Sequence, residues 1–546
     1  MSHTPFRRRL DALRRWRPEV SATTLTLATS LFSSLACNTS LWRKLADLPA
    51  VSPLFFAGMF VLVTALQFII LSLFVNRWTA KPVLALLSLL TGASVYFMDR
   101  FGVYMDAAMI RNVFETDVRE VRDLLAWDML PYLGFYVLLP WGLLARVRIR
   151  RPPLRRSGWQ PLLAVLLAAL VTGGAFFTVS KTLVPLMREQ KTLRYLITPS
   201  NYLYSLIRVY ILGESSASKP REPVGLDAKP LPRPAGAKPR LLLVVLGETQ
   251  RAANWGLNGY SRQTTPELAA RNVINYAQTT SCGTNTATSV PCMFSVYGRR
   301  HYDEDRIRGS ESVLNVLQHA GQRVLWRDNQ SGCKGVCKGV EELVMTDRKD
   351  PAFCHGDECF DGILLSGLDQ EVRKTPGDLV VVMHLMGLHG PAYFQRYPAE
   401  FRRFTPTCDT TQLETCTHQQ IVNTYDNGML YSDHVIASMI DFLKTQAGSR
   451  DTALLFVSDH GESLGENNLY LHSIPWSIAP DTQTHVPMVL WLSPEFRQAA
   501  GLREDCLRQR AAQPASHDNL FHTVLGLMGV GTSVYESGMD LTAGCR

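Results

Sequence analysis

The chain has 546 residues, with 56 Lys and Arg against 48 Asp and Glu, and therefore a formal net charge of +8. At 46% hydrophobic and 19% charged residues, it is too apolar and too weakly charged to be mainly disordered. Long uncharged runs occupy residues 1–180, whereas residues 240–546 have the mixed composition of a globular domain, so a soluble cytosolic enzyme is disfavoured.

Five uncharged stretches before residue 180 are candidates for membrane-spanning helices, which need about 20 apolar residues each. They cover residues 20–42, 48–75, 82–98, 129–145 and 157–180. The second and fifth have ample length, the third and fourth are near the short limit, and the first is rich in Ser and Thr. We predict that all five span the membrane.

Basic residues precede the first stretch, as they do in a signal peptide. However, no small-x-small cleavage site follows a compact apolar core, and the segment ending at Cys37 resembles a lipoprotein box only with Leu35 at the wrong offset. We therefore expect this stretch to stay in the chain and Cys37 to be a small buried helix residue.

The Lys and Arg residues in the short loops predict the membrane topology. The N-terminal tail and the loops at 76–81 and 145–158 carry 14 of them, whereas the loops at 41–50 and 99–125 carry 6. The N-terminus is then cytoplasmic, and the chain beyond about residue 185 lies in the periplasm, outside the inner membrane. Basic clusters that flank apolar runs indicate topology and not a nucleic-acid partner.

The 99–125 loop holds Asn112, Thr116 and Glu120 at four-residue spacing, which places them on one face of a helix. They form either the polar side of a surface helix or a ledge at the outer membrane boundary that contacts a lipid headgroup. Residues 213–239 are rich in Pro, Ser, Gly and charge, as in an extended linker. The predicted domains are a membrane domain at 1–185, a bridging helix and linker at 186–239, and a periplasmic catalytic domain at 240–546.

Ten of the eleven cysteines follow the linker. Eight of them form close pairs and two remain: Cys282/Cys292, Cys333/Cys337, Cys354/Cys359, Cys408/Cys416, and then Cys506 and Cys545. An even number in the half that is predicted to be outside indicates disulfides in an oxidising compartment, although the sequence does not fix the connectivity. A metal site at Cys333 and Cys337 is disfavoured, because no second Cys pair or His knuckle matches it.

Apolar, β-rich runs alternate with helical patterns in the outer domain. The runs are 240–246, 379–384, 453–458 and 486–492, and the helical patterns include 311–319 and 423–445. This alternation predicts a largely parallel sheet that is covered by helices on both faces. In such sheets, sites gather at the carboxyl ends of the strands.

Carboxylates and imidazoles follow three of these runs. They are Glu248 after the first run, His384 and His389 at the end of the second, Asp459, His460 and Glu462 after the third, and His472 twelve residues beyond His460. These side chains are ligands that suit zinc. A lone His at a strand end is more often structural, but three strand ends together favour a metal site.

A metal site that transfers a group covalently also needs a nucleophile. Residues 279–295 read TTSCGTNTATSVPCMFS and are dense in hydroxyl groups, which also suit a helix cap. A Thr at a helix N-terminus, coordinated by zinc, would have its alkoxide stabilised by the metal and by the helix dipole together. These arguments leave Thr284, Thr286 and Thr288 open.

Six motifs occur in one order along the chain: GETQRAANWGLNGY, SCGTNTATSVPCMFS, SGCKGVC, HLMGLHGP, SDHGESLGE and SHDNLFHTVLG. Together they resemble the lipid A phosphoethanolamine transferases, a family that includes the mobile colistin-resistance enzymes, over nearly the whole chain. The resemblance implies an N-terminal α-helical membrane domain with five transmembrane helices. It also implies a C-terminal α/β domain of the alkaline-phosphatase/sulfatase type with a mostly parallel central sheet.

The resemblance further implies residue roles. The zinc ligands are Glu248, Thr286, Asp459 and His460, with Thr286 as the nucleophile; His389 and His472 bind the substrate phosphate or a second zinc, Lys334 contacts the phosphate, Glu462 lies near the metal, and Asn112, Thr116 and Glu120 meet the lipid headgroup. Gln330 stands where some relatives have Asn, so no role is carried over to it. His517 and His522 are interpreted as structural, because residues five apart share a helix face poorly.

The implied reaction is a ping-pong transfer. Thr286 takes phosphoethanolamine from phosphatidylethanolamine, diacylglycerol leaves, and a lipid A phosphate then accepts the group, while Lys334, zinc and His389 or His472 stabilise charge. The added amine makes the outer surface less negative, which weakens the binding of polymyxin and other cationic peptides. We expect a monomer with one tightly bound Zn²⁺, and a second Zn²⁺ is left open.

Other functions remain as alternatives. A related transferase could modify the core sugars of lipopolysaccharide or another envelope glycan, or could transfer phosphoglycerol. A non-catalytic membrane sensor is least favoured, because the candidate site residues all occur together. A sulfatase is disfavoured, because no C-x-P-x-R motif surrounds Cys282 or Cys292.

Overall fold

The structure is a computed structural model that describes residues 17–48, 52–115, 127–150, 159–212, 220–356 and 358–546. Contacts divide the chain into two compact units. The described residues of Met1–Ile110 and Ala126–Arg208 form the first unit, and those of Arg111–Leu125 and Val209–Arg546 form the second. The predicted boundaries at 185 and 240 stay predictions.

The described chain before the linker is almost entirely helical. Its helices are α2 (Ala22–Ala36), α3 (Thr39–Ala46), α4 (Pro53–Phe74), α5 (Ala80–Phe101), α6 (Ala107–Glu115), α8 (Met129–Tyr132), η1 (Leu133–Leu138), α9 (Leu139–Arg146), α11 (Trp159–Glu189), η2 (Lys191–Leu196), α12 (Ser200–Leu206) and η3 (Ile207–Leu212). Two short strands, β1 (Glu19–Val20) and β2 (Arg148–Ile149), pair in parallel.

Three helices are long and apolar enough to cross a membrane: Pro53–Phe74, Ala80–Phe101 and Trp159–Val184, with mean hydropathy values of 2.5, 1.5 and 2.3. Ala22–Ala36 is a shorter apolar helix, and α8, η1 and α9 follow one another without a break. Three of the five predicted spans therefore meet this measure of length and composition, and the count of five stays a prediction.

Helix α11 packs along α4 but leaves most of its own surface open. A Cβ atom at Gly58 of α4 would lie 2.4 Å from Val179 Cγ1 of α11, so a larger residue there would push the two helices apart. Only 6% of the apolar window of α11 is buried, and Leu170 and Phe177 are 74% and 82% exposed. A long exposed apolar surface of this kind suits contact with lipid.

A polar cluster is buried in the first unit around the backbone of Thr198. Its carbonyl accepts hydrogen bonds from Ser33 Oγ at 2.9 Å, Asn38 Nδ2 at 2.9 Å and Gln67 Nε2 at 2.8 Å. Its N–H donates to Asn38 Oδ1 at 2.8 Å. Residues of α2, of the start of α3 and of α4 therefore hold one point of the segment before α12, and they satisfy a peptide group in an apolar surrounding.

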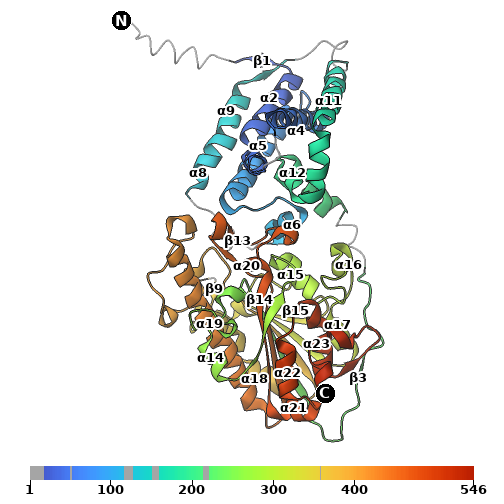
Figure 1. Cartoon of the computed structure of the whole chain (residues 1–546), viewed down its shortest axis with the longest axis vertical. Helices are drawn as coiled ribbons and strands as arrows, with labels where there is room; N and C mark the ends of the chain where they lie inside the picture. Colours follow the sequence, from blue (N-terminus) through green and yellow to red (C-terminus); the bar gives the residue numbers. More distant parts are fainter. Residues whose placement is uncertain (1–16, 49–51, 116–126, 151–158, 213–219, 357) are drawn as a thin grey trace. The chain divides into compact units, whose positions relative to one another are not determined.

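The second unit is built on an eight-stranded sheet with the order β15-β5-β14-β11-β4-β10-β6-β7 (Figure 1). The strands are β4 (Arg240–Gly247), β5 (Ile274–Thr280), β6 (Arg323–Asp328), β7 (Glu341–Val344), β10 (Leu379–His384), β11 (Asp451–Ser458), β14 (His485–Leu492) and β15 (Ala515–Ser516). Paired neighbours are parallel except that β14 runs antiparallel to both β11 and β5. The predicted, mostly parallel sheet is thus confirmed.

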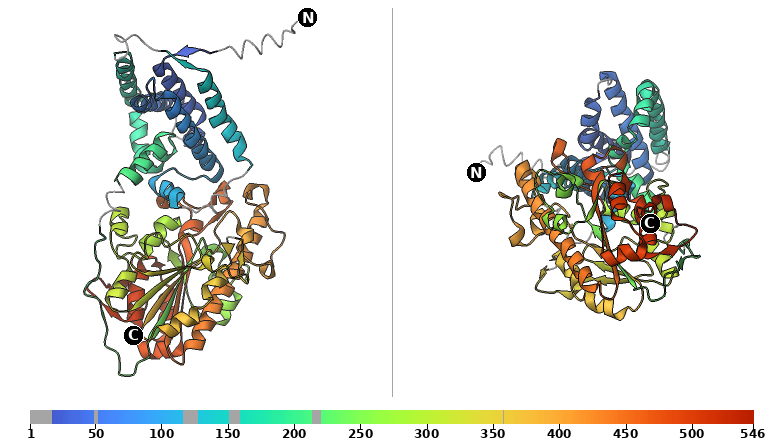
Figure 2. Two further views of the ribbon diagram at one scale, coloured as in Figure 1. Left: turned by 180° about the vertical axis from the view of Figure 1, so that it is seen from behind. Right: turned by 60° about the horizontal axis from the view of Figure 1, so that its bottom comes forward.

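Helices cover both faces of this sheet (Figures 1 and 2). On one face, α17 (Val313–His319) packs on β6 and α23 (Asp518–Met528) packs on β4. On the other face, α19 (His418–Gln446) packs on β11 and against α14 (Pro266–Ala270). The remaining described α-helices of the unit are α15 (Thr286–Met293), α16 (Glu304–Gly309), α18 (Leu368–Lys374), α20 (Asp481–Thr484), α21 (Pro494–Ala500) and α22 (Glu504–Ala511).

In the described residues of the second unit, three short strand pairs lie outside the main sheet: β3 (Lys229–Pro230) with β16 (Val530–Gly531), β8 (Cys354–His355) with β9 (Glu358–Cys359), and β12 (Ser463–Leu464) with β13 (Tyr470–Leu471). Five disulfides join the four closely spaced pairs and the two remaining cysteines, Cys282–Cys292, Cys333–Cys337, Cys354–Cys359, Cys408–Cys416 and Cys506–Cys545. Cys37 is the free cysteine and is buried as predicted, but it is the C-cap of α2 and does not lie within the helix.

Candidate active site and metal centre

Two parallel strands bring three of the candidate ligands together. In the register of β4 and β11, Gly247 pairs with Ser458, so Glu248 and Asp459 leave the sheet side by side. His460 Nε2 lies 3.4 Å from Glu248 Oε1 and 3.4 Å from Asp459 Oδ2. All three side chains are fully buried.

The hydroxyl-rich loop supplies a fourth side chain to this cluster. Asn285 caps helix α15, accepting a hydrogen bond from the N–H of Thr288 at 2.9 Å, and Thr286 is the first residue of the helix. Thr286 Oγ1 lies 3.2 and 3.1 Å from the two carboxylate oxygens of Glu248. The hydroxyl therefore sits where the positive end of the helix dipole stabilises a developing negative charge.

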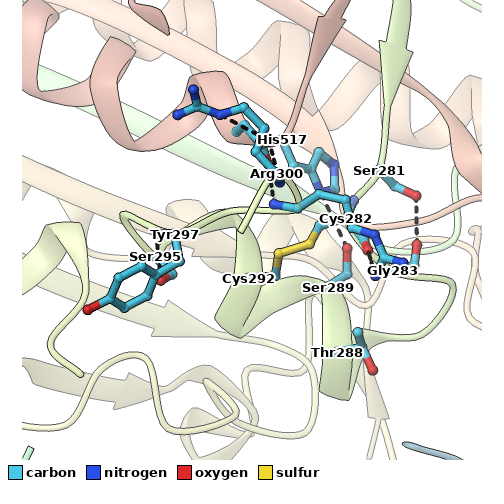
Figure 3. Close-up of a disulfide and its surroundings, with 12 residues drawn as sticks. Ser281, Cys282, Gly283, Thr288, Ser289, Cys292, Ser295, Tyr297, Arg300 and His517 are labelled. Atoms are coloured by element: carbon cyan, nitrogen blue, oxygen red, sulfur yellow. Dashed lines mark hydrogen bonds and ion pairs between the residues drawn. A yellow bond between two sulfur atoms is a disulfide. The ribbon is translucent and has the colours of Figure 1, made fainter. Parts of the chain in front are cut away.

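The three threonines that the sequence left open differ in their surroundings. Thr284 Oγ1 donates to the carbonyl of Ile474 at 2.6 Å, and the Thr288 side chain extends away from the Cys282–Cys292 disulfide in Figure 3. Thr286 is the one of the three whose hydroxyl contacts Glu248. The geometry thus favours Thr286, the residue that the resemblance implies.

The disulfide Cys282–Cys292 joins the loop to helix α15, and the inner side of the helix is fixed to the sheet (Figure 3). Ser289 Oγ donates to the backbone oxygen of Asp459. The N–H of Cys282 donates to His517 Nδ1 at 3.0 Å, and His517 Nε2 lies 2.9 Å from the carbonyl of Ser458. Both ring nitrogens of His517 are occupied, which agrees with its interpretation as a structural residue.

The charges in this cluster fit a divalent cation. Burial and the neighbouring Glu248 carboxylate raise the pKa of Asp459 well above its usual range. Asp459 Oδ2 and His460 Nε2 are buried and have no hydrogen-bond partner among the described residues. The candidate ligand atoms of Glu248, Asp459 and His460 all lie within 4.8 Å of one another. Two carboxylates, an imidazole and a hydroxyl form a donor set that zinc accepts.

Two further imidazoles border the cluster. The His472 ring lies 4.4 Å from the His460 ring and 5.8 Å from the His389 ring, measured between centroids. His472 Nδ1 lies 3.2 Å from Glu462 Oε2, which orients the ring. The structure therefore brings together His389, Glu462 and His472 beside the candidate ligands.

Lys334 lies in the loop after β6. Its backbone has a φ of 49°, and its Nζ donates to Ser331 Oγ at 2.7 Å. Gln330 in the same loop donates from Nε2 to Glu248 Oε2 at 3.2 Å. Sequence reasoning assigned no role to Gln330, and β6 before it was not among the predicted strands. Its position directly before the SGCKGVC motif, four residues before Lys334, was the signal that could have found it.

The remaining sequence candidates are placed differently. His384, at the end of β10, is fully buried, and its Nδ1 lies 3.0 Å from Asp328 Oδ2 at the end of β6. Asn112 lies in helix α6. Thr116 and Glu120 lie outside the described residues, so the proposed headgroup ledge stays a prediction.

The sheet and the cluster at its strand ends define an enzyme domain of the sulfatase-like class. A family model for sulfatases matches residues 240–530, and a model for the phosphoethanolamine transferases EptA/EptB matches residues 63–212. Phosphoethanolamine transferase EptA of Escherichia coli (strain K12) is 39% identical over 541 residues, which cover 97% of this chain and 98% of the relative. Phosphatidylethanolamine transferase Mcr-1 of Escherichia coli is 37% identical over 495 residues, 87% of this chain and 90% of the relative.

Among solved structures, the integral membrane protein lipooligosaccharide phosphoethanolamine transferase A (EptA) of Neisseria meningitidis aligns with a TM-score of 0.92 at 37% identity, covering 97% of this chain and 100% of that chain. The chain belongs to the phosphoethanolamine transferase family. It is an integral membrane enzyme with an N-terminal membrane region and a soluble periplasmic domain.

Proposed function

We propose that this enzyme transfers phosphoethanolamine from phosphatidylethanolamine to phosphate groups of lipid A, through a covalent intermediate on Thr286. The observation that most directly supports this proposal is the position of the Thr286 hydroxyl, at the start of a helix and against the buried Glu248 carboxylate. The names of the relatives support the donor and the transferred group, because they are phosphoethanolamine and phosphatidylethanolamine transferases.

Glu248, Thr286, Asp459 and His460 would hold the metal, and we propose that it is Zn²⁺. When bound, zinc supplies the positive charge that lowers the pKa of a coordinated hydroxyl and stabilises charge on phosphoryl oxygens. One such ion fits the four side chains. His389 and His472 are placed to bind the substrate phosphate or to take part in a second metal site.

In the first half-reaction, Thr286 Oγ attacks the phosphorus of phosphatidylethanolamine. The new bond from Oγ to phosphorus forms as the bond from phosphorus to the diacylglycerol oxygen breaks. The Glu248 carboxylate accepts the hydroxyl proton of Thr286. The imidazole of His389 or His472 donates a proton to the departing diacylglycerol oxygen. The N-terminus of α15 and Lys334 stabilise the phosphoryl oxygens.

In the second half-reaction, a phosphate oxygen of lipid A attacks the phosphorus on Thr286. The bond to Oγ breaks, Thr286 regains a proton, and phosphoethanolamine remains on lipid A. Each addition places an amine on an anionic acceptor, so the cell surface loses negative charge and binds polymyxin less tightly. Both substrates are lipids, which accounts for a membrane domain on the enzyme.

The membrane arrangement is part of the same proposal. The bias of Lys and Arg toward the N-terminal tail and two of the loops supports a cytoplasmic N-terminus in the inner membrane. Five disulfides in the second unit support its exposure to the oxidising periplasm. We propose that the enzyme acts as a monomer, with Asn112, Thr116 and Glu120 meeting the lipid headgroup.

A second acceptor class is kept because of one comparison. The Kdo(2)-lipid A phosphoethanolamine 7''-transferase of Escherichia coli (strain K12) is 25% identical over 526 residues, 91% of this chain. The site chemistry that we describe acts on the donor and does not select the acceptor. Transfer to a core sugar is therefore the alternative that the experiment below must separate.

Mass spectrometry of lipopolysaccharide from cells that express the wild type, Thr286→Ala or Thr288→Ala tests the proposal. We expect phosphoethanolamine on lipid A with the wild type and Thr288→Ala, and none with Thr286→Ala. Phosphoethanolamine on core sugars alone would refute lipid A as the acceptor while keeping the chemistry. Full lipid A modification by Thr286→Ala would refute the covalent intermediate.

A further inference from the structure

His472 lies in a turn with an uncommon backbone. The residues on either side of it, Leu471 and Ser473, have φ values of 60° and 75°. This left-handed region favours glycine, and a bulky residue such as Leu occupies it only when the surrounding structure holds it there. Something other than local preference must therefore fix the turn that carries His472.

The side chain of Gln483 in helix α20 contacts both ends of this turn. Gln483 Nε2 donates to the carbonyl of Leu471 at 3.1 Å, and Gln483 Oε1 accepts from the N–H of Ile474 at 3.2 Å. Nε2 also donates to Ser463 Oγ at 2.9 Å, on the strand that pairs with β13. Gln483 is fully buried, so water does not compete for these bonds.

The turn is fixed on its other side by the loop that leads to Thr286. The N–H of Ser473 donates to the carbonyl of Thr284 at 2.8 Å, and Thr284 Oγ1 donates to the carbonyl of Ile474 at 2.6 Å. His472 is thereby held at a set position relative to Thr286, two residues beyond Thr284.

The backbone of α20 joins the same parts of the site. Three successive carbonyls accept hydrogen bonds: Thr482 from the N–H of Glu462 at 2.7 Å, Gln483 from Gly461 at 2.9 Å and Thr484 from Ser281 at 2.7 Å. One short helix therefore contacts the segment after His460, the His472 turn and the start of the hydroxyl-rich loop.

We infer that Gln483 is a positioning residue, whose side chain holds the left-handed turn so that His472 faces the phosphoryl group on or near Thr286. The inference rests on the proposed function, because it gives His472 a role at the phosphate. Gln483 itself contacts the backbone and Ser463, so it acts through His472. With His472 Nδ1 engaged by Glu462, Nε2 is the ring nitrogen that can act on a substrate.

The test uses the purified full-length enzyme and a fluorescent phosphatidylethanolamine, with diacylglycerol release as the signal. Gln483→Met should lower kcat/KM by about 10- to 100-fold, as changes to residues that orient a functional group commonly do. The matched control is Gln322→Met, because Gln322 is also buried and donates from Nε2 to a backbone carbonyl, that of Met528, at the other end of the sheet. The control should lose less than twofold.

A double-mutant cycle separates positioning from a general loss of structure. In a His472→Asn background, Gln483→Met should cost less than twofold more. In hydrogen–deuterium exchange, Gln483→Met should increase uptake in a peptide covering 470–474 and leave strand β11 unchanged. Gln483→Glu keeps the side-chain size but has no N–H donor, and it replaces Gln483→Met if that variant does not fold.

Equal losses in both backgrounds, or unchanged exchange at 470–474, would overturn the positioning role of Gln483 while leaving the proposed function intact. If His472→Asn is itself inactive, the exchange measurement decides. A wild-type enzyme that releases no diacylglycerol would instead refute the proposed function, and the role of Gln483 would fall with it.

Discussion

Ser289 donates a hydrogen bond from its side chain to the backbone oxygen of Asp459. Helix α15, which begins at Thr286, is thus bonded directly to the strand end that supplies two of the proposed metal ligands. Both residues are fully buried. This hydroxyl group is therefore one of the contacts that set the distance between the proposed nucleophile and the metal cluster, together with the contacts through His517 and Thr284.

Replacing Ser289 by Ala should destabilise the enzyme and slow it. A buried carbonyl left without its partner costs about 1–3 kcal/mol of unfolding free energy. Chemical denaturation and donor turnover measure the two effects. Ser449→Ala is the control, since Ser449 is exposed and donates to the carbonyl of Gln446. Equal stability of Ser289→Ala and wild type would show that the bond is dispensable.

Gly461 should tolerate no larger side chain. Gly461 lies between His460 and Glu462 in the sequence. A Cβ atom on Gly461 would lie 2.1 Å from the carbonyl oxygen of Thr482. Gly461→Ala should therefore displace one of these segments and reduce both the zinc content and the activity by at least tenfold. Gly448→Ala is the control, because its Cβ would meet nothing within 4 Å. Full zinc occupancy in purified Gly461→Ala would contradict this expectation.

Two disulfides should differ in what their removal costs. The loop closed by Cys506–Cys545 has a sequence separation of 39, against 4 for Cys333–Cys337. Loop-closure entropy assigns about 4 kcal/mol to the longer loop and about 2 kcal/mol to the shorter one. Replacing Cys506 and Cys545 by Ala should lower the melting temperature more. Replacing Cys333 and Cys337 should mainly raise KM, because Lys334 lies between them. The opposite ranking in melting temperature would refute the loop-length argument here.

His517 should make the folded enzyme sensitive to acid. Burial lowers its pKa to about 4, so the folded protein keeps it neutral while the unfolded chain binds a proton near the ordinary value of about 6.5. The contribution of His517 to the free energy of unfolding is fully present above about pH 6.5. It falls by about 3 kcal/mol as the pH is lowered toward 4.

Unfolding of the wild type and His517→Asn at pH 7 and pH 4.5 measures this contribution. The variant should lose less stability on acidification than the wild type does. The exposed His418 provides the control, and His418→Asn should lose as much as the wild type. Equal acid sensitivity of all three proteins would show that His517 takes up no proton on unfolding in this range.

The central strands could be predicted from the sequence because both of their faces are buried, and such strands consist mostly of apolar residues. β4, β10 and β11 are buried along their whole length, so they read as continuous apolar runs. β6 is equally internal after its first residue, but it contains Arg323, Arg327 and Asp328, and charged residues conceal a strand from this kind of reasoning. β5 alternates between buried and partly exposed residues next to the short edge strand β15, and it was missed for that reason.

The candidate site could be predicted as a set of residue types and only partly as an arrangement. Glu248, Asp459 and His460 follow predicted strands, so their proximity was expected from a parallel sheet. The contact between Gln330 and Glu248 was not, because it requires β6 to pair with β10 and β10 with β4. The hydrogen bonds from Gln483 to both ends of the His472 turn depend on a left-handed backbone that no local pattern of residues predicts.

The carbonyl of Thr198 accepts from three side chains that lie 165, 160 and 131 residues away in sequence. Because Ser33, Asn38 and Gln67 share a single acceptor, a substitution at one of them alters the hydrogen bonds that the other two donate. Among relatives, substitutions at these three positions should therefore occur together. Exchanging α2 alone between two such enzymes would import a donor without its matching partners, so a working chimera would need to carry the whole set.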